Sequence, residues 1–255
     1  MPERRQLTMT RLRTDWVVLW TFSRRAAARF WSARPVYSLG LPLCGLCLWV
    51  GLMGVGEPAP DRGQIWDFDA LPPGLLPGAF RVGTLFDGRP AGEWRVLITD
   101  RAKSPGQVLA QVLPKGSDQT HKVLLIEGTA VGDVDLEVSY LAVSGKVDVG
   151  GGLVWRAADD RNYYLIRASS VEQKVRLYRV VKGVQQVIKQ VDRNISPTGW
   201  HSLHILQRGC EIQAYFDGEP VTRVCDPTFA TGRAGVWTNA DAVTYFDDLR
   251  LRRLN

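Results

Sequence analysis

Short segments in which apolar and polar residues alternate dominate the sequence after residue 90. They span residues 94–98, 123–127, 134–140, 152–156, 163–168, 175–181, 201–206, 211–216, 234–237 and 245–251. Turn-forming residues such as Asp217-Gly218 separate them, and no convincing amphipathic helix lies between them. Because alternation with period two is typical of strands that bury one face, the sequence predicts an all-β fold. We expect an antiparallel β-sandwich or jelly roll over residues 79–255.

The clearest predicted hairpin turns at Asp217-Gly218, since this pair favours the positive φ angles of a two-residue turn. If Phe216 lies opposite Glu219, uniform pairing places Cys210 opposite Cys225. This register predicts a cross-strand disulfide and therefore an oxidising compartment. Two reduced, partly buried thiols are the alternative, because the register puts the pair at a hydrogen-bonded site where a bridge is more strained.

Residues 36–56 form a run of 21 residues without a formal charge. At about 1.5 Å per residue a helix of this length spans roughly 30 Å, the thickness of a bilayer core. Arg24, Arg25, Arg29 and Arg34 precede the run, and no Lys or Arg follows it until Arg62. The positive-inside bias therefore predicts a cytoplasmic N-terminus and an extracytoplasmic C-terminal domain.

We expect this run to be a retained transmembrane helix or signal-anchor, with a cleaved signal peptide as the alternative. The preceding basic and aromatic segment, residues 1–35, is long for a signal peptide, and residues 57–60 offer no clean small-x-small cleavage site. Residues 57–78 are proline-rich and read as a linker. The predicted location is the bacterial inner membrane, as a single-pass protein with a periplasmic domain. The bilayer and a membrane protein complex are the expected partners of the N-terminal part.

The net charge of +6 is unevenly distributed. The first 60 residues hold eight Arg and three acids, a net of +5, and the remaining 195 hold 24 basic and 23 acidic side chains, a net of +1. The part large enough to fold is therefore nearly neutral. A nucleic-acid partner is not expected.

Several sequence blocks resemble one known family. They are GKVD at 145–148, GGLVWR at 151–156, NYY at 162–164, VRLY at 175–178, GWH at 199–201, FDG at 216–218, DPTF at 226–229, GRAGVWT at 232–238 and FDD at 246–248. In this order they resemble the concanavalin A-like lectin/glucanase superfamily, in its bacterial LamG-like or 3-keto-disaccharide hydrolase-like branch. The similarity covers residues 65–254. It implies a jelly roll, a fold that hosts enzymes, lectins and adhesive modules alike.

Three carboxylates, Asp133, Asp135 and Glu137, alternate along one predicted strand and so share one of its faces. Glycoside hydrolases of the concanavalin A-like superfamily arrange a nucleophile, a helper and an acid in this way along one strand. They have Glu where this sequence has Asp133. The residues are the candidates for a retaining glycosidase pair. The alternative is a row of acids on the solvent side of a half-buried strand.

Aromatic and Arg side chains in the same blocks are the candidates for ligand binding, because aromatic rings stack on sugars and Arg donates paired hydrogen bonds. They are Trp155, Arg156, Tyr164, Arg167, Tyr178 and Trp237. Arg156 and Arg167 are expected to line one sheet face. The alternative places the aromatic rings in the sandwich core and pairs each Arg with a nearby acid.

No metal or other cofactor is expected. Only three histidines occur, and His201 and His204 are predicted to lie on opposite faces of their strand, which argues against a zinc pair. Asp247 and Asp248, with Asp241 or Asp217, are the weak candidates for a calcium site, which some members of the resembling superfamily bind. Structural capping of loops is the alternative.

Together these features favour a noncatalytic, membrane-anchored module whose exported jelly roll contacts a membrane protein complex or binds a glycan. A scaffold or accessory role slightly outranks a lectin role, because the aromatic, Arg-rich segment adds surface at the membrane. The alternative is a carbohydrate-active enzyme that uses the carboxylates of residues 133–137.

Overall fold

The computed structural model describes residues 63–85, 88–104 and 106–254. These residues form fifteen strands, and the described ranges contain no helix. The strands are β1 (Gln64–Trp66), β2 (Phe80–Val82), β3 (Trp94–Ile98), β4 (Gln107–Gln111), β5 (His121–Ile126), β6 (Val134–Ser144), β7 (Gly150–Asp159), β8 (Asn162–Ser169), β9 (Lys174–Val181), β10 (Val184–Asp192), β11 (His201–Arg208), β12 (Glu211–Phe216), β13 (Glu219–Cys225), β14 (Arg233–Asn239) and β15 (Val243–Arg253). The predicted all-β class is confirmed.

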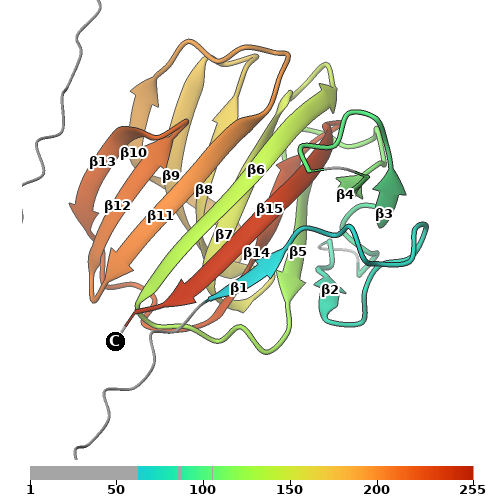
Figure 1. Cartoon of the computed structure of the whole chain (residues 1–255). Coiled ribbons are helices and arrows are strands. Elements are labelled where there is room, and N and C mark those ends of the chain that lie inside the picture. The colour runs from blue at the N-terminus through green and yellow to red at the C-terminus, as the bar shows by residue number, and fades with distance from the viewer. Residues whose placement is uncertain (1–62, 86–87, 105, 255) are drawn as a thin grey trace, which may run out of the picture. The chain divides into compact units, whose positions relative to one another are not determined.

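The strands form two antiparallel sheets, sheet A and sheet B. Sheet A has the order β13-β12-β11-β6-β15-β4-β3, and β1 also pairs with β15. Sheet B has the order β10-β9-β8-β7-β14-β5-β2. Figure 1 shows the sheets as stacked layers, with β6 and β15 in front of β7 and β14. The predicted antiparallel sandwich is thus confirmed, and β1 adds three residues of the expected linker to sheet A.

The main core lies between the sheets and follows the alternation of the strands. Leu136 and Leu251 of sheet A and Ile166 and Val236 of sheet B are at most 1% exposed and belong to one cluster. The residues that flank them in sequence point away from this core. Both sheets therefore present a second, outer face.

The outer face of sheet B carries a separate apolar cluster. It comprises Val123, Leu125, Val154, Ala157, Tyr163, Leu165, Tyr178, Val180 and Trp237. Trp237 packs over Gly152, since a Cβ on Gly152 would lie 3.1 Å from the Trp237 ring. Because all of these side chains are at most 5% exposed, this outer face is covered rather than open to solvent.

β12 and β13 form the predicted hairpin. Asp217 and Gly218 have φ angles of 50° and 79°, and Phe216 lies opposite Glu219 as expected. A β-bulge near Tyr215 then shifts the pairing by one residue. The predicted uniform register is wrong beyond this point, because pairing residues one for one outward from the turn cannot detect an extra residue in one strand.

Cys210 and Cys225 nevertheless form a disulfide, with Cα atoms 4.8 Å apart. After the shift Cys225 lies opposite Glu211, so the bridge joins neighbouring rather than directly opposed positions. The Asp226 amide donates to the Cys210 carbonyl at 2.8 Å beside it. The disulfide itself is as predicted.

Four strands have no counterpart among the predicted segments, namely β1, β2, β4 and β10. β4 is buried throughout, so it lacks alternation, whereas the edge strand β10 is largely exposed and rich in Gln. β1 and β2 have only three residues each. Within the described residues no helix is long and apolar enough to cross a membrane. The predicted transmembrane run, residues 36–56, lies outside them.

Candidate functional site

Two of the predicted ligand-binding residues, Trp155 and Tyr164, lie in the core between the sheets, where both are fully buried. Their rings stack with centroids 5.5 Å apart. Trp155 Nε1 donates to Gln207 Oε1 at 2.5 Å, and the Tyr164 hydroxyl donates to Asp226 Oδ1 at 2.7 Å. These contacts tie sheet B to sheet A and to the loop after β13.

Arg156 lies at a bulge in β7, has a φ of 46° and is 2% exposed. Its guanidinium donates to the carbonyls of Gly132, Gly209 and Phe229 at 2.8–2.9 Å. It also contacts Asp133 Oδ1 at 3.2 Å. Arg156 is therefore a structural link between loops at one end of the sandwich, and it does not share a sheet face with Arg167.

Arg167 and Trp237 do meet, on the outer face of sheet B, together with His121. The Arg167 guanidinium carbon lies 5.7 Å from the Trp237 ring centroid, and the His121 ring lies 5.6 Å from it. Glu172 contacts Arg167 at 2.5 Å and Asp148 lies 3.8 Å away. The structure thus groups two of the predicted binding residues with a histidine that sequence reasoning did not assign to ligand binding.

A hollow of about 450 Å³ opens beside His121. Asp118, Gln119 and His121 line one side of it, and Gly183, Val184 and Gln185 line the other. The first group leads into β5 and the second follows β9, and four strands of sheet B separate β5 from β10. The hollow therefore lies where these two segments approach each other above the outer face of sheet B.

Four buried polar atoms on this face have no hydrogen-bond partner in the described part of the chain. They are Gln185 Nε2, Arg167 Nε, Trp237 Nε1 and Asn239 Oδ1. Asn239 pairs with His121 in the sheet register, and Gln185 lines the hollow. Buried polar groups are almost always satisfied, and ordered water is a usual partner of such atoms, so these atoms are exceptions within the fold.

Burial, reinforced by the positive charge of Arg167, lowers the pKa of His121 from 6.5 to about 4. The imidazole is therefore neutral at physiological pH and offers one donor and one acceptor. A neutral ring is well suited to hydrogen-bond an uncharged hydroxyl.

The same shift predicts an acid-sensitive stability. Between pH 6.5 and 4, His121 is protonated in the unfolded chain but stays neutral in the folded chain. The free energy of unfolding therefore falls by up to about 3 kcal/mol as the pH decreases through this range. Urea unfolding of the wild type and of His121→Gln at several pH values checks this. His121→Gln should lose this part of the slope, and an identical slope in both proteins would contradict it.

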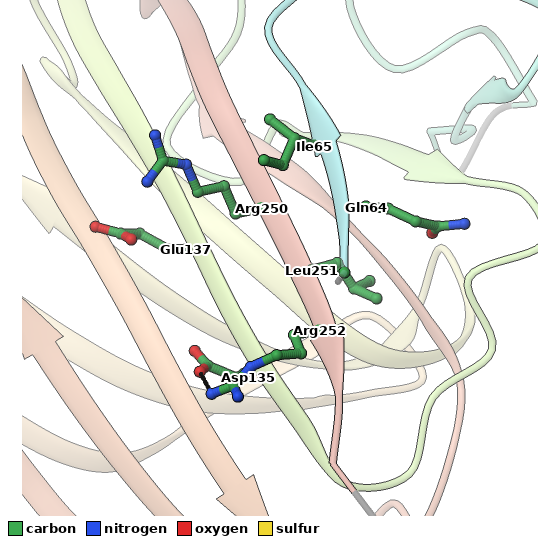
Figure 2. Close-up of a pocket in the computed structure, with 8 residues that line it drawn as sticks. Gln64, Ile65, Asp135, Glu137, Arg250, Leu251 and Arg252 are labelled. Atoms are coloured by element: carbon green, nitrogen blue, oxygen red, sulfur yellow. Dashed lines mark hydrogen bonds and ion pairs between the residues drawn. The ribbon is translucent and has the colours of Figure 1, made fainter. Parts of the chain in front are cut away.

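The three carboxylates of the predicted catalytic strand do not share one site. Asp133 accepts from the Gly209 amide at 2.8 Å and contacts Arg156, at the end of the sandwich. Asp135 and Glu137 lie on the outer face of sheet A and line a groove of about 210 Å³ (Figure 2).

Asp135 is held between two cationic or hydrogen-bonding partners. His204 Nε2 lies 2.7 Å from one carboxylate oxygen and Arg252 lies 2.6 Å from the other. The hydrogen bond from His204, together with Arg252, lowers the pKa of Asp135 to about 2. Asp135 is therefore ionised and unsuited to the role of general acid.

The candidate calcium ligands have structural roles in the described chain. Asp247 is fully buried and accepts from the Lys103 and Ser104 amides at 3.1 and 3.0 Å. Asp241 accepts from the amides of residues 146–148 at 2.8–3.2 Å. Within the described residues no group of three or more His, Cys, Asp and Glu side chains is arranged to hold a metal ion.

No family model matches the sequence, and no curated protein matches it. The fold is similar to a carbohydrate-binding module, CBM66 from Bacillus subtilis, with a TM-score of 0.55 and 19% identity over 68% of this chain and 95% of that one. It is also similar to the GH43 protein BlXynB from Bacillus licheniformis, with a TM-score of 0.54 and 15% identity over 76% of this chain and 40% of that one. A structure described with endo-acting O-glycanases of the human gut microbiota has a TM-score of 0.53 and 11% identity, over 75% and 99%.

At sequence identities of 11–19%, these similarities show a shared fold and nothing about a shared function. They confirm the jelly-roll sandwich that the resemblance to the concanavalin A-like lectin/glucanase superfamily implied. Because one fold hosts many functions, the function of this chain depends on the residues of its own surfaces.

Proposed function

We propose that the chain is a noncatalytic glycan-binding module whose site is the hollow beside His121. The observation that carries the proposal is the hollow itself, with neutral His121 at its wall and unpartnered polar atoms on the same sheet face. The jelly-roll neighbours, which include a carbohydrate-binding module, support the same class of ligand.

The chemistry of the hollow fits an uncharged sugar. Gln119, Gln185 and His121 offer donors and acceptors at the wall, and Asp118 offers a further acceptor. The exposed Val184 side chain adds an apolar surface against which a sugar ring packs. Pockets of this volume enclose small ligands, and few polar groups placed around an apolar surface provide their specificity.

We further propose that residues 36–56 hold this module at the outer side of a bacterial inner membrane. The uncharged run, the arginines before it and the disulfide of the folded domain all support this placement. A role as an accessory subunit of a membrane complex is compatible with glycan binding, because the N-terminal segment and the hollow are different parts of the chain.

The enzyme alternative has less support. A retaining glycosidase needs one carboxylate as nucleophile and a second with a raised pKa as acid. Asp133 is engaged at the end of the sandwich and Asp135 is bound by His204 and Arg252, which leaves Glu137 alone in the groove. We therefore expect no hydrolysis by the wild type on glycans that it binds.

A matched pair of neighbouring Gln residues tests the proposed site. Gln185 lines the hollow, whereas Gln186 accepts a hydrogen bond from Arg179 on the other side of the strand. Gln185→Ala should weaken binding on a glycan array by about tenfold, because one desolvated hydrogen bond contributes about 1 kcal/mol or more. Gln186→Ala should bind as the wild type does.

His121 lines the same hollow, so His121→Ala is an independent test of the site and should also weaken glycan binding. Equal binding by the wild type and by all three variants would contradict the proposed site. Release of reducing sugar from a bound glycan, abolished by Glu137→Gln, would instead favour the enzyme.

A further inference from the structure

The loop from β10 to β11 carries the one Asn-x-Ser/Thr pattern of the sequence. Asn194 is followed by Ile195 and Ser196, so no Pro lies between the asparagine and the hydroxyl. This pattern is the acceptor sequence of asparagine-linked glycosylation, which modifies surface loops of secreted proteins. The pattern is short, and its meaning therefore depends on how the structure presents Asn194.

The structure exposes the Asn194 side chain. This residue lies outside the strands, and its side-chain amide has no hydrogen-bond partner in the described part of the chain. Its neighbours hold the backbone, since the Arg193 amide donates to the Gln173 carbonyl at 3.0 Å and the Ile195 amide donates to Gln173 Oε1 at 2.9 Å. Ile195 is 2% exposed and packs in the main core. Because side chains of an extended segment alternate, Asn194 points away from that core.

Asp192 places a negative charge two residues before Asn194. Its side chain is 84% exposed, and the Lys174 ammonium lies 3.6 Å from one of its oxygens. An exposed pair of this kind is weak, so the carboxylate remains accessible to a basic group of an enzyme. The segment thus offers an acid on one side of the asparagine amide and a hydroxyl on the other.

The hydroxyl of Ser196 is engaged only within its own loop. It donates to the Thr198 carbonyl at 2.7 Å and accepts from the Thr198 amide at 3.2 Å. Residues 193–200 pair with no strand, and they include Pro197 and Gly199, whose φ is 95°. Local opening of such an exposed segment costs much less than unfolding of the whole domain. An enzyme can therefore engage this hydroxyl while the sandwich stays folded.

We propose that Asn194 is the acceptor of an oligosaccharide that a membrane-bound glycosyltransferase transfers from a polyprenyl diphosphate donor. The nitrogen Nδ2 of Asn194 forms a bond to the anomeric carbon of the first sugar, and the bond from this carbon to the diphosphate oxygen breaks. One proton leaves Nδ2 and the polyprenyl diphosphate is released, so nothing is oxidised or reduced. This inference rests on the extracytoplasmic placement of the domain in the proposed function.

The proposed modification site and the hollow lie at opposite ends of β10. Gln185 is the second residue of this strand, and Asn194 lies two residues beyond its end. Nine residues at about 3.3 Å each separate the two positions by roughly 30 Å. The attached sugar and the glycan bound in the hollow are therefore separate features, and each has its own measurement.

Peptide mass spectrometry of the full chain, purified in detergent from the membranes of its native cells, tests the site. The wild type should carry one oligosaccharide on the peptide of residues 194–208. Asn194→Gln, Ser196→Ala and Asp192→Ala should each lose this added mass. Ser196→Thr should keep it, because Thr retains the hydroxyl. Asn162→Gln is the matched control outside the pattern and should keep it as well.

The redox state of Cys210 and Cys225 in the same sample separates the two ways of failing. Alkylation of free thiols before reduction reports this state. An intact disulfide with an unmodified Asn194 would overturn the inference and leave the extracytoplasmic placement standing, whereas free thiols with an unmodified Asn194 would overturn both. An added mass that persists in Asn194→Gln would also overturn the inference. Its persistence in Asp192→Ala would contradict recognition through the carboxylate.

Discussion

Replacing Arg156 by Leu is expected to lower the free energy of unfolding by about 3–5 kcal/mol. The side chain is almost completely buried, and it donates to three carbonyls from three different loops in addition to contacting Asp133. Leu cannot replace these donors, so buried carbonyl oxygens lose their partners. Urea unfolding of the full chain in detergent measures the loss.

Arg81→Leu is the matched control. Arg81 pairs with Glu127, but its side chain is 42% exposed. Exposed ion pairs contribute at most about 1 kcal/mol, so this variant should change stability little. The stability loss of Arg156→Lys should lie between those of the two Leu variants, because Lys keeps the positive charge but lacks the planar guanidinium group with its several donors. Equal stability losses in Arg156→Leu and Arg81→Leu would show that Arg156 does not link the loops.

The second large effect concerns the disulfide. Cys210 and Cys225 are 15 residues apart, and closing a loop of this length stabilises a fold by about 3 kcal/mol in the chain-entropy account. The double variant Cys210→Ser, Cys225→Ser should therefore lose about 3 kcal/mol of unfolding free energy. Reduction of the wild type by a thiol should produce the same loss and leave the double variant unchanged.

The disulfide and Arg156 should also be coupled. Gly209 precedes Cys210, and its carbonyl accepts from Arg156 while its amide donates to Asp133. Neighbouring residues that hold one turn give non-additive stability losses. The triple variant should therefore differ from the sum of the two effects by more than about 0.5 kcal/mol. No effect of reduction on the wild type would contradict a stabilising role for the bridge.

The sheets were largely predictable because the sandwich buries one face of most strands. β3 and β12 coincide with predicted segments, and most of the other predicted strands extend by a few residues. The exceptions have physical causes. β4 is buried on both faces and β10 is largely exposed, so neither alternates in the way that a half-buried strand does.

The site was less predictable, since one residue of offset moves a side chain to the other side of a sheet. Trp155 and Tyr164 face the core, and the bulge in β7 turns Arg156 towards the loops instead of placing it beside Arg167. His121 and Gln185 are distant in sequence, and only the approach of two loops above sheet B brings them together. A signal for His121 did exist, because successive side chains of a strand point to opposite faces, and His121 therefore lies on the same face as Val123 and Leu125.

Hydrogen exchange of the full chain, with and without the disaccharide that binds most tightly, tests the proposed function most directly. A sugar bound in the hollow should slow the exchange of backbone amides in residues 118–121 and 183–185, the two segments that line it. Peptides that cover the β12–β13 hairpin should exchange at an unchanged rate. Protection confined to other segments, or binding without any protection around His121 and Gln185, would contradict the account.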